Sequence, residues 1–433
     1  MAAKQETKKS TANTEWFVRD RLGMFIHWGT YALAARHEWV KNHERTPTGE
    51  YDKYFAHFDP DLFNPREWAR QAKAAGMKYF VITAKHHEGF CLWNTKYTDY
   101  KAPNTPYGRD LLKPVIEAFR DEGLRVGLYY SLLDWHHPDF TVDRHHPMRD
   151  NPEERKKNAQ RRMPRYAAYM RNQVRELLTK YGKIDVVWFD FSYPGEDGKG
   201  HADWESEKLY ALIRQLQPEI MVDNRLDLAY AGDFVTPEQF QPAAPLVDKD
   251  GKPAVWEACQ TLSGSWGYHR DECTWKSTDL LIRMLVDGVS KGGNLLLNVG
   301  PTARGELDYR ARERLEGIGR WMRVNSRSIY GCGPAPAEFT PPADCRFTYN
   351  PQTRRLYLHA FAWPFKDIFC PGLPPERVAY AQFLHDASEV FFRPVPEASW
   401  NALGNHLPKN LCAFHVPIIK PPVDVPVIEI FLK

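Results

Sequence analysis

An apolar run, Val186-Val187-Trp188-Phe189-Asp190-Phe191, is interrupted near its end by a single carboxylate. Such a run predicts a buried parallel strand, in which only the C-terminal end is open enough for an ionised Asp190. Side chains alternate between the two faces of a strand, so Trp188 and Asp190 point the same way and place an aromatic ring beside a carboxylate. An isolated aspartate at a strand end more often caps the following loop, so the interpretation depends on the rest of the chain.

The chain has 433 residues, enough for one large barrel or sheet domain and a smaller module. Its 43% hydrophobic and 26% charged residues are ordinary for a soluble globular protein, and the formal net charge of +3 argues against a dedicated nucleic-acid-binding protein. Fourteen Trp and 21 Tyr support sugar-stacking surfaces only weakly, because large cores use aromatic residues in the same way.

Cysteine usage and the N-terminus bear on the compartment. Seven cysteines without a CxxC spacing indicate neither a zinc site nor a complete disulfide framework, so reduced thiols are expected. Residues 1–14 are polar and rich in Lys, and no stretch approaches the ~20 apolar residues of a membrane span. We expect a disordered lead over residues 1–14 and a soluble, cytoplasmic protein that does not contact the membrane, although a removed signal peptide would leave the same sequence.

Predicted strands and helices alternate from residue 15 to about residue 335. Short strands with polar residues at their C-terminal ends favour a (β/α)8-like, TIM-type barrel over an open sheet. After a cluster of Pro and Gly over residues 331–342, alternating apolar runs predict a small C-terminal β-module from residue 336 to residue 433. Its last predicted strand is 425–432, which Pro426 would limit to an edge or a bulge.

The C-terminal ends of barrel strands converge on one mouth, so residues distant in the sequence can meet there. The strand-end residues of this chain are His27, His86, His87, Tyr129, Trp188, Asp190, Arg225, Glu238 and Trp266. Two carboxylates among neutral donors and aromatic rings are typical of a glycosidase cleft. Retaining glycosidases hold the two carboxyl groups roughly 5 Å apart, one as nucleophile and one as proton donor.

Two alternatives come from the same residues. A metal-dependent barrel hydrolase could use His27, His86, His87 and Asp190 as ligands. Against it, His86 and His87 are adjacent in an extended segment, where side chains diverge. A non-catalytic carbohydrate-binding protein would keep the aromatic rings but would need neither acid. No nucleotide-binding or serine-hydrolase motif occurs in its required context, so we expect no cofactor.

Several motifs, in order along the chain, carry a family resemblance. They are Phe25-Ile26-His27-Trp28-Gly29, residues 85–93 (KHHEGFCLW), residues 127–131 (GLYYS), Trp188-Phe189-Asp190, Trp266-Gly267-Tyr268 and residues 294–301 (NLLLNVGP). With them the chain resembles the α-L-fucosidases of glycoside hydrolase family 29 over about residues 15–335. The resemblance implies an irregular barrel over 15–335, a β-sandwich over 336–433, and hydrolysis of terminal α-L-fucose from fucosylated glycans with retention, through a covalent fucosyl-enzyme and without a metal.

The resemblance also implies roles for single residues. Asp190 is the expected nucleophile, with Trp188 in the same pocket. The expected fucose-binding residues are His27, Glu38, Trp39, His86, His87, Tyr129 and Arg225, with Trp266 near the apolar methyl edge of the sugar. Two acids compete as the acid/base: Glu238 and Glu257. We favour Glu238, because it lies in a loop that can reach over the leaving group, whereas Glu257 lies in a predicted strand. Linkage preference stays open, as does assembly into a homo-oligomer.

Overall fold

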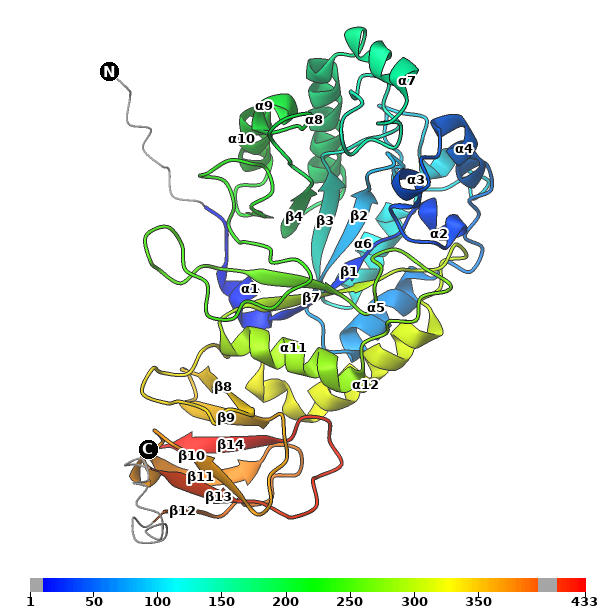
Figure 1. Cartoon of the computed structure of the whole chain (residues 1–433). Helices are drawn as coiled ribbons and strands as arrows, with labels where there is room; N and C mark the ends of the chain where they lie inside the picture. Colours follow the sequence, from blue (N-terminus) through cyan, green and yellow to red (C-terminus); the bar gives the residue numbers. More distant parts are fainter. Residues whose placement is uncertain (1–10, 396–410) are drawn as a thin grey trace, which may run out of the picture.

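The computed structural model describes residues 11–395 and 411–433 (Figure 1). Its larger part is built on a parallel sheet with the strand order β5-β4-β3-β2-β1-β7-β6. These strands are β1 (Leu22–Ile26), β2 (Tyr79–Lys85), β3 (Arg125–Ser131), β4 (Val186–Asp190), β5 (Met221–Val222), β6 (Glu257–Thr261) and β7 (Asn294–Val299). All but the ends of these strands are buried, as the continuous apolar runs predicted.

Residues 233–239 connect the two outer strands of this sheet. Isolated parallel bridges pair Asp223 with Phe234, next to β5, and Val235 with Trp256, next to β6. A third bridge pairs Glu238 with Cys259 in β6. The ring of strands therefore closes through an irregular segment in place of a regular eighth strand, and the predicted irregular (β/α)8-like barrel is confirmed.

Helices cover the outside of the barrel (Figure 1). The long ones are α5 (Pro65–Ala74), α6 (Leu112–Asp121), α8 (Met163–Lys180), α10 (Ser206–Leu216), α11 (Thr278–Ser290) and α12 (Tyr309–Asn325). Short helices lie in the connections: α2 (Tyr31–Ala34), α3 (Val40–His43), α4 (Thr48–Ala56), α7 (Pro152–Lys156) and α9 (His201–Trp204). Between β5 and β6, a stretch that the structure describes throughout, there is no helix.

Aromatic rings fill the interior of the barrel. Helix α1 (Glu15–Asp20) precedes β1 and buries Trp16 and Phe17. The Phe17 ring lies 5.5 Å from that of Tyr79 and 5.0 Å from that of Phe234. Nearer the C-terminal ends of the strands, the ring of Phe25 lies 5.3 Å from that of Trp188. The N-terminal end of the barrel interior is filled in this way, and barrel enzymes typically have their sites at the C-terminal end.

The C-terminal part is a sandwich of two antiparallel sheets that share one apolar core. One sheet has the order β11-β14-β9-β8 and the other the order β10-β13-β12. The strands are β8 (Cys345–Asn350), β9 (Arg355–Ala360), β10 (Asp367–Cys370), β11 (Val378–Phe383), β12 (Phe392–Pro394), β13 (Cys412–His415) and β14 (Val427–Leu432). Helices α11 and α12 lie between this sandwich and the barrel (Figure 1).

The expectation for the last strand was wrong. Pro426 was expected to confine it to an edge or a bulge, but β14 is an inner strand between β11 and β9. Pro426 lies just before the strand and needs no N–H there, while its carbonyl accepts a hydrogen bond of 3.0 Å from the Ala360 N–H. The irregularity in this sheet lies in β11, between Val378 and Tyr380.

Some expectations concern the ends of the chain and its general class. Disorder was expected over residues 1–14, of which residues 1–10 lie outside the described residues, and the boundary at residue 335 stays a prediction. Thr11 and Asn13 donate hydrogen bonds to the carbonyls of Pro218 and Glu219. All seven cysteines are free thiols. Among the described residues, no helix combines the length and the apolar character needed to cross a membrane.

Candidate active site

A cavity of about 250 Å³ opens at the C-terminal end of the barrel strands. Pockets for drug-sized ligands typically measure ~300–1,000 Å³, so this smaller cavity suits a single sugar ring. It is lined by Phe25, His27, Trp39, His86, His87, Tyr129, Trp188, Asp190, Phe191, Arg225, Glu238, Cys259 and Trp266. All nine strand-end residues singled out in the sequence are therefore brought together here.

Asp190 is the last residue of β4, and its side chain is 14% exposed. Both carboxylate oxygens have partners. The Tyr129 hydroxyl donates to Oδ2 at 2.8 Å, and Nη1 of Arg225 donates to Oδ1 at 2.7 Å. These two donors, one of which is a cation, fix the direction of the carboxylate into the cavity.

Arg225 touches both acids of the cavity. Its Nη1 binds Asp190, and its Nη2 lies 2.7 Å from Oε2 of Glu238. The guanidinium lies 4.4 Å from the ring centroid of Trp188, and its Nε donates to Thr236 Oγ1 at 2.9 Å. Trp188 and Asp190 thus share one face of β4 as predicted, and Arg225 packs over the aromatic ring to reach both carboxylates.

Glu238 lies in the irregular segment that closes the barrel, and 41% of its side chain is exposed. Burial of the carboxyl group raises its pKa above the usual value, and the negative charge of Asp190 acts in the same direction. The cation of Arg225 opposes them and lowers this pKa. The net effect is an acid that keeps its proton to a higher pH than an ordinary glutamate, as a proton donor requires.

Glu257, the second acid/base candidate, lies elsewhere. It begins β6, at the N-terminal end of the barrel interior, and is fully buried. The Tyr79 hydroxyl donates a hydrogen bond to Glu257 Oε2. Burial raises the pKa of Glu257 to about 8. It does not line the cavity, so only Glu238 of the two candidates is among the lining residues.

Two histidines of the cavity are held neutral. Burial lowers the pKa values of His27 and His87 well below the usual histidine value. Nδ1 of His27 lies 2.6 Å from Oδ1 of Asn298, whose amide Nδ2 donates to the Trp266 carbonyl. Because Oδ1 is then an acceptor, His27 carries its proton on Nδ1 and leaves Nε2 free to accept from a hydroxyl.

The side chains of His86 and His87 lie closer together than expected. Their side chains were expected to diverge, but the ring centroids lie 3.9 Å apart and both rings line the cavity. The segment leaves the regular strand here, because the register of β2 shifts between Thr83 and Lys85 and the strand ends at Lys85. Among the described residues, no group of three or more His, Cys, Asp or Glu side chains is placed to hold a metal ion.

Trp39 and Trp266 line the cavity as expected, but Glu38 lies behind its wall. Glu38 is buried, and its Oε2 accepts hydrogen bonds from the backbone N–H groups of Trp266 and Gly267 at 3.1 and 2.8 Å. In this structure Glu38 therefore holds the Trp266 loop in place. Direct contact of Glu38 with a sugar stays a prediction.

Sequence reasoning missed three lining residues: Phe25, Phe191 and Cys259. Phe25 could have been found, because it lies two residues before His27 and so shares its strand face. Phe191 could not, because its backbone has a φ of +75°, a conformation that bulky side chains rarely adopt. This turn directs its ring toward Trp39 and His87, with centroids 5.1 Å away in each case.

A (β/α)8-like barrel with two carboxylates, neutral histidines and aromatic rings at its mouth defines a glycoside hydrolase of the barrel class. The family model described as "Alpha-L-fucosidase" matches residues 1–327. The chain belongs to this family, the α-L-fucosidases of glycoside hydrolase family 29.

Named relatives agree with this assignment. The chain is 47% identical to α-L-fucosidase isoenzyme 1 from Paenibacillus thiaminolyticus, whose solved structure superposes with a TM-score of 0.89 over 97% of this chain and 98% of that one. It is 28% identical to a family 29 α-L-fucosidase from Bacteroides thetaiotaomicron, solved as a trapped covalent intermediate with 2-fluoro-fucosyl fluoride, with a TM-score of 0.83 and full coverage of both chains. It is 31% identical to the tissue α-L-fucosidase of Homo sapiens over 74% of this chain and 69% of the relative.

Proposed function

We propose that this protein is a retaining exo-α-L-fucosidase that removes terminal α-L-fucose from glycans, with Asp190 as nucleophile and Glu238 as acid/base. The observation that carries the proposal is the contact of one guanidinium, that of Arg225, with both carboxylates inside a cavity the size of one sugar. Membership of the α-L-fucosidase family supports the sugar, and the covalent intermediate trapped in the Bacteroides relative supports a nucleophilic mechanism.

In the first step an oxygen of Asp190 attacks the anomeric carbon of fucose. The bond from this carbon to the glycosidic oxygen breaks, and Glu238 transfers its proton to that oxygen, so the leaving group departs as a neutral alcohol. The product is an ester between fucose and Asp190, with the configuration at the anomeric carbon inverted. Tyr129 and Arg225 orient the carboxylate for this attack.

In the second step water replaces the leaving group. Glu238, now a carboxylate, takes a proton from the water as the water oxygen attacks the anomeric carbon and the bond to Asp190 breaks. This second inversion restores the original configuration. The neutral histidines and aromatic rings bind hydroxyls and apolar edges of the sugar without adding charge to the site.

The test uses p-nitrophenyl α-L-fucoside, with α-galactoside, β-galactoside and ester substrates as controls. We expect turnover of the fucoside alone, unchanged by EDTA, and a loss of at least about a thousandfold in kcat for Asp190→Gly. EDTA-sensitive turnover or cleavage of the ester would contradict the proposal and favour a metal-dependent hydrolase.

Azide then separates the two carboxylate roles by stereochemistry. With Asp190→Gly, azide takes the place of the nucleophile and one inversion gives β-fucosyl azide. With Glu238→Ala, azide attacks the fucosyl-enzyme and a second inversion gives α-fucosyl azide. Glu257→Gln serves as the matched control and forms no azide product in excess of the wild type. The same azide anomer from both variants, or an active Asp190→Gly, would refute these assignments.

A further inference from the structure

Two of the three histidines in the sugar cavity have a hydrogen-bond partner behind the ring. His27 has Asn298 at its Nδ1, as described above, and His87 has Ser131. The third, His86, has no partner at Nδ1 within the part of the chain that the structure describes. A neutral imidazole carries one proton, so the partner at Nδ1 decides whether Nε2 donates or accepts a hydrogen bond. The proton positions of His27 and His87 therefore follow from their partners.

Ser131 is the last residue of β3, and its side chain is fully buried. Its Oγ lies 2.7 Å from Nδ1 of His87 and accepts a hydrogen bond of 3.0 Å from the backbone N–H of Leu133. Among the described residues, no other acceptor lies within hydrogen-bond distance of this hydroxyl. The hydroxyl proton therefore points to Nδ1 of His87, because a buried donor without an acceptor is strongly disfavoured.

This assignment places the proton of His87 on Nε2. Burial keeps the ring neutral, because it lowers the pKa of His87 well below the usual histidine value. Since Nδ1 accepts from Ser131, the one proton of the neutral ring lies on the other nitrogen. Nε2 lies 3.9 Å from Oδ2 of Asp190. His87 therefore presents an N–H donor to the cavity beside the proposed nucleophile.

Aromatic neighbours hold the His87 ring in this orientation. The ring centroids of Trp39, Trp135 and Phe191 lie 5.0, 5.4 and 5.1 Å from that of His87. The backbone is held as well, because the Trp135 N–H donates to the His87 carbonyl at 2.9 Å. A flip of the ring would exchange Nδ1 with a C–H group and leave the Ser131 hydroxyl without an acceptor. The packed ring thus keeps Nδ1 toward Ser131.

His27 has the opposite arrangement. Its Nδ1 carries the proton and donates to Oδ1 of Asn298, which leaves Nε2 as an acceptor. The two neutral histidines therefore differ in the hydrogen bond that they offer to the cavity, because His27 accepts and His87 donates. A sugar can satisfy both, since each hydroxyl donates one hydrogen bond and accepts others.

We propose that Ser131 is a positioning residue of the enzyme, which fixes His87 as a hydrogen-bond donor so that His87 and His27 bind the sugar with opposite polarity. This inference rests on the proposed function. Ser131 is not among the residues that line the cavity, so it acts through the His87 ring. A sugar oxygen near the reacting carbon accepts from His87, and a hydroxyl of the same sugar donates to His27.

Neutron diffraction from a deuterium-exchanged crystal of the wild-type protein at pH 7 locates these protons directly. We expect deuterium on Nε2 and not on Nδ1 of His87, and the reverse on His27. The Ser131 hydroxyl should point to Nδ1 of His87. Deuterium on Nδ1 of His87 would overturn the inference. This measurement does not depend on turnover, so it tests the proton positions even if the proposed function fails.

Ser131→Ala tests what the hydroxyl contributes to the reaction. We expect kcat/KM on p-nitrophenyl α-L-fucoside to fall by about tenfold, because a His87 ring without its partner loses its directed hydrogen bond to the sugar. Ser131→Thr keeps a hydroxyl and should retain most of the activity. Ser328→Ala is the matched control. It also removes a buried hydroxyl, which donates to the Asn325 carbonyl at 2.7 Å, but Ser328 does not line the cavity.

The outcomes separate this inference from the proposed function. An unchanged kcat/KM in Ser131→Ala, or equal losses in Ser131→Ala and Ser131→Thr, would overturn the role of Ser131 and leave the fucosidase assignment standing. A wild-type protein inactive on the fucoside would overturn the proposed function itself. Thermal unfolding of each variant shows that a changed rate comes from folded protein.

Discussion

Arg225 couples the charges of the two acids that face the sugar. Its cation favours the ionised form of Glu238 and so lowers the pKa of that carboxyl, while burial and Asp190 raise it. The balance between these effects sets the pH range in which free enzyme carries a protonated Glu238.

Substitution of Arg225 by Met therefore has a directional effect on the pH profile. Without the cation the pKa of Glu238 rises, so the acid form persists to higher pH and the alkaline limb of kcat/KM moves upward. The rate also falls, because Asp190 loses a partner. The measurement is the pH profile of kcat/KM on p-nitrophenyl α-L-fucoside, with the exposed Arg304→Met as control. An alkaline limb that stays in place or moves downward would contradict this role.

Glu257 affects stability in a pH-dependent way. Its folded-state pKa of about 8 lies above the ordinary value of 4.5, because burial favours the neutral carboxyl. The stabilising contribution is therefore fully present below pH 4.5 and is lost as the pH rises through 8. Glu257→Gln is neutral at every pH, so between pH 5 and 8 its free energy of unfolding should fall less than that of the wild type. Urea unfolding at pH 5 and at pH 8 measures these free energies. If the free energy of unfolding falls equally in the wild type and in Glu257→Gln, Glu257 is not neutral in the folded protein.

At this scale the sequence predicted which residues meet, because strand alternation and strand ends follow from simple geometry. Trp188 and Asp190 share a face, and the histidines reach the same mouth. It could not predict the turn at Phe191, which needs an unfavourable φ, or the position of Glu38 behind Trp266, which depends on loop hydrogen bonds. Such features arise from tertiary contacts that no local pattern encodes.

Among the elements, the segment 233–239 shows why barrel closure was hard to predict in detail. It pairs with its neighbours only through isolated bridges and contains Pro237, so it has no strand periodicity. Its irregular backbone nevertheless places Glu238 opposite Asp190, on either side of Arg225. The predicted strand ends indicated where the barrel opens. The position of Glu238 at that opening could be seen only in the structure.

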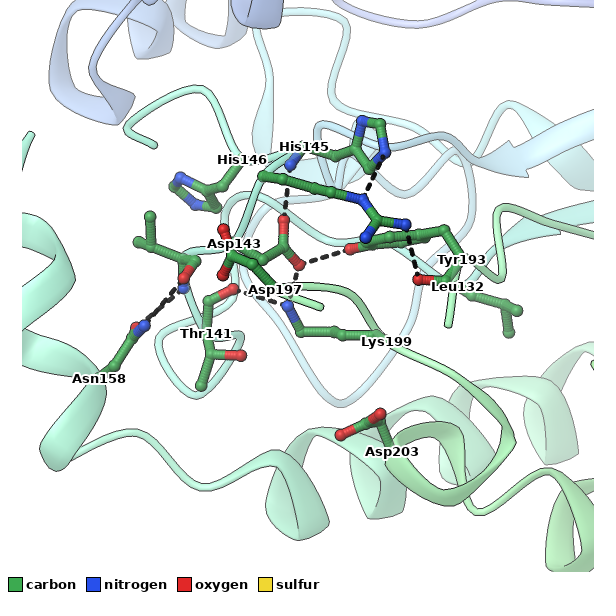
Figure 2. Close-up of polar contacts among 12 residues, drawn as sticks. Leu132, Thr141, Asp143, His145, His146, Asn158, Tyr193, Asp197, Lys199 and Asp203 are labelled. Atoms are coloured by element: carbon green, nitrogen blue, oxygen red, sulfur yellow. Dashed lines mark hydrogen bonds and ion pairs between the residues drawn. The ribbon is translucent and has the colours of Figure 1, made fainter. Parts of the chain in front are cut away.

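The loops after β3 and β4 depend on the buried Asp143–Lys199 ion pair. The side chains are only 5% and 3% exposed. Lys199→Met removes the cationic partner of the Asp143 carboxylate, which stays buried (Figure 2). We therefore expect the free energy of unfolding to fall by about 3–5 kcal/mol. In the double variant Asp143→Asn, Lys199→Met, most of this loss should be recovered. Urea unfolding of both single variants and the double variant measures the coupling; purely additive losses would show that the pair contributes nothing as a pair.

At the scale of the whole molecule, the order of predicted elements was enough to identify the barrel and the β-module, since alternating strands and helices admit few folds. The packing of these two parts on each other was not predictable. Val425 and Val427 of the sandwich belong to the same apolar cluster as the barrel helices, and Arg346 in β8 forms an ion pair of 2.8 Å with Asp287 in α11. Such an interface depends on which faces meet, which local periodicity does not specify.

This shared core predicts that barrel and sandwich unfold together. Trp321 in α12 donates its indole N–H to the carbonyl of Val425 at 2.9 Å, in a buried contact across the interface. Trp321→Phe leaves that carbonyl without its partner, so we expect a loss of roughly 1–3 kcal/mol of stability for the whole chain. Differential scanning calorimetry should show one transition that moves to lower temperature in the variant, with equal calorimetric and van't Hoff enthalpies. Two separate transitions in the wild type, or a shift in only one of them, would contradict this prediction. The barrel and the sandwich would then unfold independently.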